Sequence, residues 1–419
     1  AVNGDTALIG AYGDQVGAVQ QQGSVYVFTR SGAAWSQVQK LTAADGAASD
    51  HFGSAIAMSG YAAIIGAPDD TINGAASRGS AYIFNNNGGA TWSQQQKLTA
   101  SDGGANHNFG AAVALDGPTA LVGAYNNGGG AAYVFAYDGT TWNQQQELFP
   151  NDPAPGNFFG SAVSLSGELA VIGAQRYDTV QNQNQGAAYL FERTGIVWNQ
   201  RQKLLASDAA TEDRFGWAVA LAGDTAIVGA ILHDVGANQD QGSATVFVYA
   251  DSHWTQQANL LASDGSPGDQ FGNAVAISGD FAAVGSSFDT VGANSFQGSA
   301  WVYSRVGTKW INSDFKVFAA DGSLNDLFGN AVAISGDTAV VGAYHDDVDG
   351  KVHQGSAYVF VRSGSSWVQQ ARLNASDGSA GDVSSGFADR SDDYLAVAAK
   401  VELGDDASRD KVWRAVARL

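Results

Sequence analysis

The 419-residue sequence predicts an all-β fold, a single β-propeller built from four-stranded antiparallel blades. Self-similarity at a period near 56 residues indicates a solenoid, a propeller or an array. Each copy contains four short segments rich in Val, Ile, Tyr, Phe and Ala, and no segment has a helical period, which favours the propeller. The repeat is marked by Phe-Gly, which recurs at intervals of 50 to 57 residues at Phe52-Gly53, Phe109-Gly110, Phe159-Gly160, Phe215-Gly216, Phe271-Gly272 and Phe328-Gly329.

The four strands of a blade, here called a to d from first to last, are clearest in the copy that begins at Phe271. We predict them at residues 273–278, 281–286, 299–305 and 310–318, with Gly and Asp at the joins. A Trp opens strand d in each copy and is predicted to fill the gap between splayed blades. The Gly of the recurrent Val-Gly-Ala in strand b is predicted to mark a close backbone approach or a bulge.

The number of blades is left open between seven and eight. Val-Gly-Ala or its equivalent occurs seven times, and a degenerate eighth copy occupies residues 384–419. Ala1 and Val2 look like the end of a strand a, so the first copy is expected to be truncated at its start. We treat residues 1–419 as one propeller domain, for which the repeat count favours eight blades.

Composition and charge exclude several functions. The formal charge is −20, whereas binding to nucleic acid or to an anionic membrane surface depends on clustered Lys and Arg. The sequence has no Cys and therefore no disulfide or thiolate chemistry, and it has no apolar stretch long enough for a membrane-spanning helix. Hydrophobic residues make up 45% of the chain, which is enough to bury a core.

Acidic residues concentrate in the loops of one predicted face. In a four-stranded blade, the b–c loop and the d–a loop between successive blades lie at the same end, and these two loop sets hold 22 Asp. We call this end the loop face and predict that it binds the ligand. The candidate ligand-binding residues on it are Asp14, Asp70, Asp178, Asp234, Asp289 and His345.

Pairs of Asp in the d–a loops have two interpretations. They can hydrogen-bond to the backbone of their own loop, or they can ligate Ca²⁺ or another hard cation. The sequence requires no cofactor, and Ca²⁺ is the candidate ion. The candidate metal ligands are Asp264, Asp269, Asp321, Asp326, Asp346, Asp347 and Asp349.

The Phe-Gly and Val-Gly-Ala units together resemble the FG-GAP repeat, and residues 65–68 contain Gly-Ala-Pro itself. The chain is similar to the propellers of integrin α-subunits and, more closely, to bacterial secreted and cell-surface FG-GAP proteins, over essentially its whole length. This resemblance implies a propeller, usually of seven blades, that serves adhesion or binds proteins and carbohydrates. The calcium loop of integrin-type blades is not carried over, because the join between strands a and b is only Ser-Gly-Asp or similar.

The predicted function is that of a non-enzymatic binding, adhesion or assembly module that is secreted or displayed on the cell surface. G-x-S-x-G, H-E-x-x-H and the P-loop are absent from the sequence. The first alternative is a carbohydrate-binding lectin, and the second is a polysaccharide-active lyase or hydrolase. The expected partners are a protein or a surface glycan, and open chain ends would allow self-assembly through unpaired strand edges.

Overall fold

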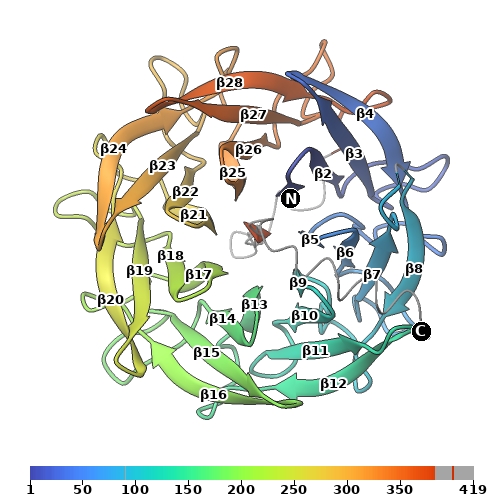
Figure 1. Ribbon diagram of the computed structural model, residues 1–419, viewed down its shortest axis with the longest axis horizontal. Helices are drawn as coiled ribbons and strands as arrows, with labels where there is room; N and C mark the ends of the chain where they lie inside the picture. The colour runs from blue at the N-terminus through green and yellow to red at the C-terminus, as the bar shows by residue number, and fades with distance from the viewer. Residues whose placement is uncertain (90, 383–398, 401–419) are drawn as a thin grey trace.

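The computed structural model describes residues 1–89, 91–382 and 399–400. The described residues form seven four-stranded antiparallel blades in a ring (Figure 1). Within each blade the strands follow sequence order from the centre of the ring to its rim. The all-β propeller is therefore confirmed with seven blades, and the expectation of eight from the repeat count is wrong.

The strands have the following bounds. Blades 1 to 3 comprise β1 (Val2–Asn3), β2 (Thr6–Ala11), β3 (Ser24–Ser31) and β4 (Ala34–Leu41); β5 (Ile56–Ser59), β6 (Ala62–Ala67), β7 (Ser80–Asn85) and β8 (Ser93–Leu98); and β9 (Ala112–Asp116), β10 (Thr119–Ala124), β11 (Ala131–Tyr137) and β12 (Trp142–Leu148). Blades 4 and 5 comprise β13 (Phe159–Ser166), β14 (Leu169–Ala174), β15 (Ala187–Thr194) and β16 (Val197–Leu204); and β17 (Phe215–Ala222), β18 (Thr225–Ala230), β19 (Ser243–Ala250) and β20 (His253–Leu260). Blades 6 and 7 comprise β21 (Phe271–Ser278), β22 (Phe281–Ser286), β23 (Ser299–Val306) and β24 (Lys309–Val317); and β25 (Phe328–Ser335), β26 (Thr338–Ala343), β27 (Ser356–Ser363) and β28 (Ser366–Leu373).

The two ends of the repeat series differ from the regular copies. The start of the chain supplies a short strand a, β1, which pairs with β2 through Val2 and Ala7, as the sequence predicts. The degenerate eighth copy at 384–419 lies outside the described residues except for β29 (Ala399–Lys400), which pairs in parallel with β21. The ring therefore contains seven copies of strand b and seven blades.

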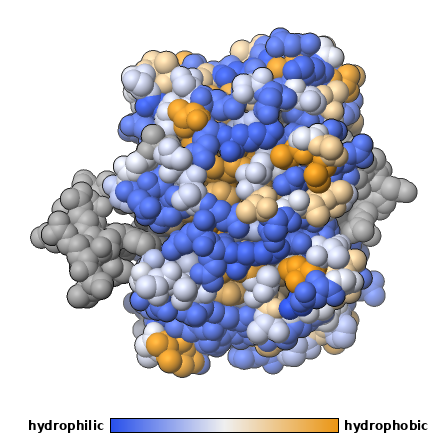
Figure 2. All heavy atoms as spheres, turned by 90° about the vertical axis from the view of Figure 1, so that its right-hand side faces the viewer, coloured by the Kyte–Doolittle hydropathy of each residue, from blue (hydrophilic) through white to orange (hydrophobic). Residues whose placement is uncertain are grey.

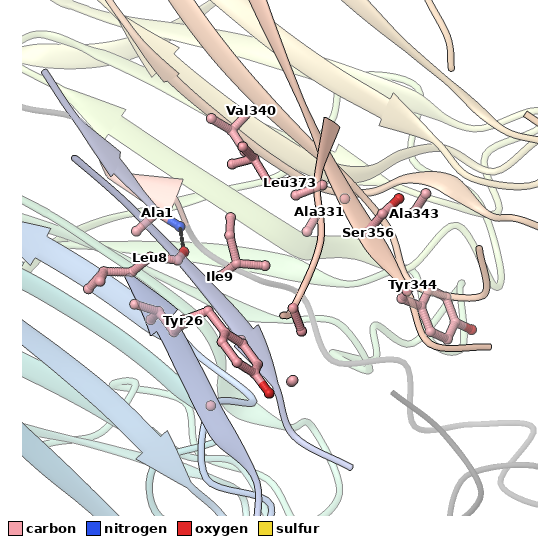
Figure 3. A pocket seen from close by; sticks show the side chains of 18 of the residues that line it. Ala1, Leu8, Ile9, Tyr26, Ala331, Val340, Ala343, Tyr344, Ser356 and Leu373 are labelled. Carbon is pink, nitrogen blue, oxygen red and sulfur yellow. Dashed lines mark hydrogen bonds between the residues drawn. The ribbon is translucent and has the colours of Figure 1, made fainter. Parts of the chain in front are cut away.

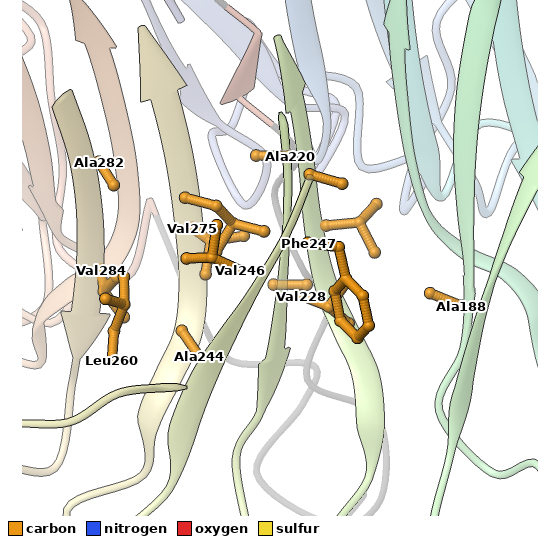
Figure 4. Close-up of a cluster of buried hydrophobic side chains, with 14 of the residues drawn as sticks. Ala188, Ala220, Val228, Ala244, Val246, Phe247, Leu260, Val275, Ala282 and Val284 are labelled. Carbon is orange, nitrogen blue, oxygen red and sulfur yellow. The ribbon is translucent and has the colours of Figure 1, made fainter. Parts of the chain in front are cut away.

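The hydrophobic core lies between neighbouring blades. Successive residues of β19 point to opposite sides, so that Val246 faces the Val275 side and Phe247 faces the Ala188 side (Figure 4). The Trp at the start of strand d is buried in blades 2 to 5, at 2–4% exposure, which confirms the predicted core role for these rings. Each blade thus contributes to two interfaces and is stabilised by both neighbours.

Glycines of the repeat allow neighbouring backbones to approach each other. A Cβ atom on Gly66 would lie 1.9 Å from the carbonyl oxygen of Gly110 in the next blade. Gly79, at φ +82°, pairs with Phe109 across the same junction, and a Cβ atom there would lie 2.1 Å from the Phe109 oxygen. The predicted close approach is confirmed, and it explains why Phe-Gly, Val-Gly-Ala and Gln-Gly recur together.

Glutamine side chains join the outermost strands of neighbouring blades. Gln96 donates from Nε2 to the Trp142 carbonyl at 2.7 Å and accepts from the Trp142 amide at 2.8 Å. Gln39, Gln146 and Gln202 make the same reciprocal pair with the next blade. The rim seen edge-on is accordingly mostly hydrophilic, with separated hydrophobic groups (Figure 2).

Candidate functional site: the loop face

The b–c and d–a loops form one continuous face, as predicted. The b–c loop of blade 1 accepts three backbone hydrogen bonds from the d–a loop that follows it, from Ser49 to Gln20 at 3.1 Å, from His51 to Gln21 at 3.3 Å and from Phe52 to Gln22 at 2.9 Å. Equivalent bonds recur at the following junctions. Each b–c loop is thereby fixed against the entry to the next blade.

A partly buried cation connects the two loop sets in blade 2. Lys97 Nζ lies 2.7 Å from Asp70 of the b–c loop and 2.6 Å from Asp45 of the preceding d–a loop. Tyr82 donates its hydroxyl to Asp45 at 2.9 Å. Burial acts to raise the pKa of Asp45, but the bonds from Lys97 and Tyr82 outweigh it and hold that pKa below its ordinary value. We call this arrangement the cation cradle.

The cation cradle recurs in four further blades. Its cation is Lys40 in blade 1, Lys316 in blade 6 and Arg372 in blade 7, each between a b–c Asp and a d–a Asp. In blade 4 the cation is Lys203, which lies between Asp152 and the hydroxyl of Tyr177. The predicted ligand-binding residues Asp14, Asp70 and Asp289 are consequently buried in ion pairs, with side chains only 4–7% exposed. The predicted metal ligands Asp264, Asp321 and Asp346 likewise lie 2.6–2.8 Å from Lys316 or Arg372.

The second Asp of each d–a pair closes its own loop. The Ser266 amide donates to Asp269 at 2.6 Å, and the Ser323 amide donates to Asp326 at 2.5 Å. Burial raises the pKa of both carboxyl groups to about 6. The structure thus shows backbone bonds at these two candidate metal ligands, which is the first of the two interpretations of the Asp pairs.

The remaining predicted residues lie in the b–c loops nearer the solvent. Asp178 and Asp234 accept backbone hydrogen bonds within their loops, from Asn184 and Asp240 at 2.6 and 2.9 Å. Asp347 accepts from the His353 amide at 2.8 Å, and Asp349 is exposed at φ +52°. The His345 ring stacks on the His353 ring at 4.4 Å, and burial together with His353 lowers the pKa of His345 to about 4.

Metal binding on the loop face stays an untested prediction. Within residues 1–89, 91–382 and 399–400, no group of three or more His, Cys, Asp or Glu side chains is arranged to hold a metal ion. Asp264, Asp321 and Asp346 are bonded to Lys or Arg, and Asp269, Asp326 and Asp347 are bonded to backbone amides. Ca²⁺ takes six to eight oxygen ligands, so it would have to displace these partners.

Blade 3 departs from the other blades on this face. Its b–c loop is shorter by six residues, and Glu147 stands where five blades carry Lys or Arg. Tyr133 still donates to Asp102 at 2.9 Å, and the Asn127 amide bonds to the Tyr133 oxygen at 2.9 Å. Burial and the nearby charge of Asp102 raise the pKa of Glu147. Blade 3 therefore keeps the d–a acceptor Asp102 and the tyrosine Tyr133, has Asn127 in place of the b–c Asp, and lacks the cation.

Sequence reasoning missed the cradle cations and the left-handed loop residues at the blade junctions. The signal for the cations was present, because strand d ends in Lys-Leu, Lys-Val or Arg-Leu in those five blades. The register of the b–c acids was a second signal. An Asp four residues after the Gly of strand b is buried, as at Asp70 and Asp289, whereas one five residues after it is exposed, as at Asp178 and Asp234.

Non-glycine residues with left-handed backbone occur in pairs at five junctions. One residue lies in the b–c loop, and its carbonyl accepts a hydrogen bond of 3.0–3.3 Å from the residue that precedes Phe-Gly in the next blade. All ten residues have φ between +46° and +56°. We call them the junction pairs: Gln21–His51, Ser77–Asn108, Asn184–Arg214, Asp240–Gln270 and Phe296–Leu327.

An apolar hollow of about 150 Å³ lies between blades 7 and 1 (Figure 3). Its lining includes Ile9, Tyr26, Val340 and Leu373, which come from the facing strands of the two blades. The lining side chains carry no charge. The hollow therefore lacks the opposed carboxylates with which glycosidases act.

Comparison with models of known protein families identifies the family of the chain. The FG-GAP repeat model matches residues 35–84, 92–135, 142–191, 198–247, 254–303 and 312–360, which is more than half of the sequence. The chain therefore belongs to the FG-GAP repeat family. The first match runs from strand d of blade 1 to strand c of blade 2, so it spans a junction between blades. A search of curated proteins found no match.

Proposed function

We propose that this protein is a non-enzymatic extracellular module that binds a protein partner through its loop face. Membership of the FG-GAP family supports a binding role, since FG-GAP propellers typically act without catalysis and are often extracellular. The described residues form no helix of the length and apolarity needed to cross a bilayer. The loops that project from a rigid scaffold are where binding residues concentrate in proteins.

The observation that carries the proposal is the set of junction pairs. Left-handed backbone is unfavourable by roughly 1–2 kcal/mol for a residue with a side chain. Glycine avoids this strain, and it occupies a left-handed position of the d–a loops at Gly156 and Gly268. The junction pairs keep side chains despite the strain, and their chemistry is polar at the first two junctions and then cationic, acidic and apolar. The b–c member of each pair is at least partly exposed, whereas His51, Asn108 and Leu327 are buried. Strained, varied side chains on a repeated scaffold are typical of a recognition surface.

A binding screen with a matched variant tests this proposal. The labelled protein is applied to a panel of purified extracellular proteins and to a glycan array, beside a variant with Gln21→Gly, Asn184→Gly and Asp240→Gly. We expect a protein partner, which the triple variant binds about ten-fold more weakly because contact side chains are lost. The melting temperature of the variant should not fall, since glycine suits these backbone angles.

The control variant is Arg201→Ala. Arg201 lies on the outermost strand of blade 4 and pairs with Glu192 at 2.5 Å, away from the loop face. It should bind the partner as tightly as the wild type does. Binding to glycans alone would support the lectin alternative, and release of oligosaccharides from a polysaccharide would support the enzyme alternative. Either result would contradict the proposal.

Self-assembly through open strand edges is a separate proposal. It rests on the general tendency of unpaired edges to add strands. Light scattering at working concentration tests it, and a monomer would contradict it.

A further inference from the structure

The junction pair between blades 6 and 7 is the one of the five in which both side chains are apolar. Phe296 is 44% exposed at φ +56°, and its ring lies 5.6 Å from the ring of Phe288. Leu324 of the neighbouring d–a loop is 59% exposed. We call the exposed Phe296 and Leu324, the partly buried Phe288 and the buried Leu327 the junction patch.

Backbone hydrogen bonds hold the two loops of the junction patch side by side. The Asn325 amide donates to the Ser295 carbonyl at 3.1 Å, and the Leu327 amide donates to the Phe296 carbonyl at 3.1 Å. Phe296 and Leu324 therefore come from adjacent loop segments and not from scattered positions on the face.

The other blades show that the fold does not require large apolar side chains at the positions of Phe296 and Leu324. The position of Phe296 holds Gln21, Ser77, Asn184, Asp240 and His353 in the other blades that have it. The position of Leu324 holds Ala48, Ala105, Pro155, Thr211, Pro267 and Ala380. A large apolar residue with left-handed backbone and exposure to water is unfavourable twice over in the unbound protein. Exposed apolar side chains of this kind typically mark a surface that a partner covers.

The charges around the junction patch indicate the chemistry of that partner. Asp347 and Asp349 are exposed on the b–c loop of blade 7, and Asp321 is exposed on the d–a loop, where it pairs with Arg372 at 2.8 Å. Lys351 is the cation within the described part of these loops, and its ammonium group already donates to the Gly378 carbonyl at 2.6 Å. The surroundings of the patch are therefore acidic, and a basic segment is electrostatically complementary to them.

We propose that the junction patch docks a partner protein's segment in which apolar side chains are flanked by Lys or Arg. The inference rests on the proposed function and assigns its central contact to one junction. Phe296 supplies the apolar contact area, and the exposed acids around it orient the basic groups.

The test uses the full chain and a defined probe, a short labelled peptide of alternating Lys and Leu, with binding followed by fluorescence anisotropy. Two companion peptides carry Glu in place of Lys or Ser in place of Leu. The test variant is Phe296→Asn with Leu324→Ala, residues that stand at these positions in other blades. The matched control is Val180→Asn, since Val180 is 97% exposed on the b–c loop of blade 4.

We expect the wild type and the Val180 variant to bind the Lys-Leu peptide equally, and the double variant to bind it at least about five-fold more weakly. Both companion peptides should bind more weakly than the Lys-Leu peptide. No binding by the wild type, equal binding by the double variant, or equal binding of either companion would overturn the inference. If that happens while the triple glycine variant still loses its protein partner, the proposed function stands and the junction patch is not its docking site.

Discussion

At the scale of single residues, glycine contacts set the distance between blades. We expect Gly66→Ala to lower the free energy of unfolding by about 3 kcal/mol, because its Cβ atom would lie 1.9 Å from the backbone oxygen of Gly110. Gly89→Ala is the control, since a Cβ atom there would meet its nearest neighbour, the Asn86 oxygen, at 3.2 Å in an exposed turn. Urea denaturation measures both, and equal midpoints would contradict the described blade contact.

Buried loop carboxyl groups give a second residue-scale prediction, a change of stability with pH. Burial raises the pKa of Asp50, Asp269 and Asp326 to about 6, above the value of about 3.9 in an unfolded chain. Between pH 4 and pH 6 the unfolded chain therefore loses these protons first, and the free energy of unfolding falls as the pH rises. Replacing all three with Asn should remove this part of the fall, about 1 kcal/mol per site after allowance for solvent screening.

Urea titrations from pH 4 to pH 7 on the wild type and the Asn variant measure this difference. Other acids act in the opposite sense, since hydrogen bonds from Lys97 and Lys203 outweigh burial and lower the pKa of Asp45 and Asp152. The comparison between the two proteins cancels that background. Identical pH profiles would mean that the three carboxyl groups are already solvated in the native state.

At the scale of elements, the cation cradle explains how one blade binds the next. We expect Glu147→Lys to raise the free energy of unfolding by about 1 kcal/mol, because it returns a cation to the acceptors Asp102 and Tyr133 in blade 3. Glu147→Gln is the control, since it removes the carboxylate without adding a cation. The account of the cradle is wrong if the Lys variant is no more stable than the Gln variant in chemical denaturation.

Sequence patterns predicted the strands well and their mutual contacts poorly. β22 has its predicted bounds, and the alternation of apolar residues located the other strands of that blade to within two residues at each end. The Gln96–Trp142 and Lys97–Asp45 contacts join residues about 50 positions apart, so no local pattern reveals them. Gln, Lys and Asp recur in the repeat, but their pairing depends on which blade each side chain faces.

At the scale of the whole molecule, the number of blades follows from the pairing of the first strand. The sequence contains eight copies of the repeat, of which the first and the last are incomplete, and the repeat pattern did not show which blade each incomplete copy belongs to. The pairing of Val2 with Ala7 shows that blade 1 takes its strand a from the start of the chain. Strand partners are a property of the folded ring, which is why the repeat count alone favoured the wrong number.

Calcium gives a whole-molecule prediction. Because Lys316 and Arg372 neutralise Asp264 and Asp321 at 2.7–2.8 Å, we expect the fold to be independent of metal ions. The melting temperature should be the same with excess chelator and with added Ca²⁺. A clear rise with Ca²⁺ would show that the loop carboxylates exchange their protein partners for the ion.

The central claim is that the repeat builds a rigid ring, while the varied junction pairs of its loop face recognise a protein. The most direct test is the dissociation constant of the partner found in the screen, measured for the wild type and for the triple glycine variant, with the melting temperature of each. The account predicts an affinity about ten-fold weaker at an unchanged or higher melting temperature. An unchanged affinity, or a loss that appears only with unfolding, would contradict it.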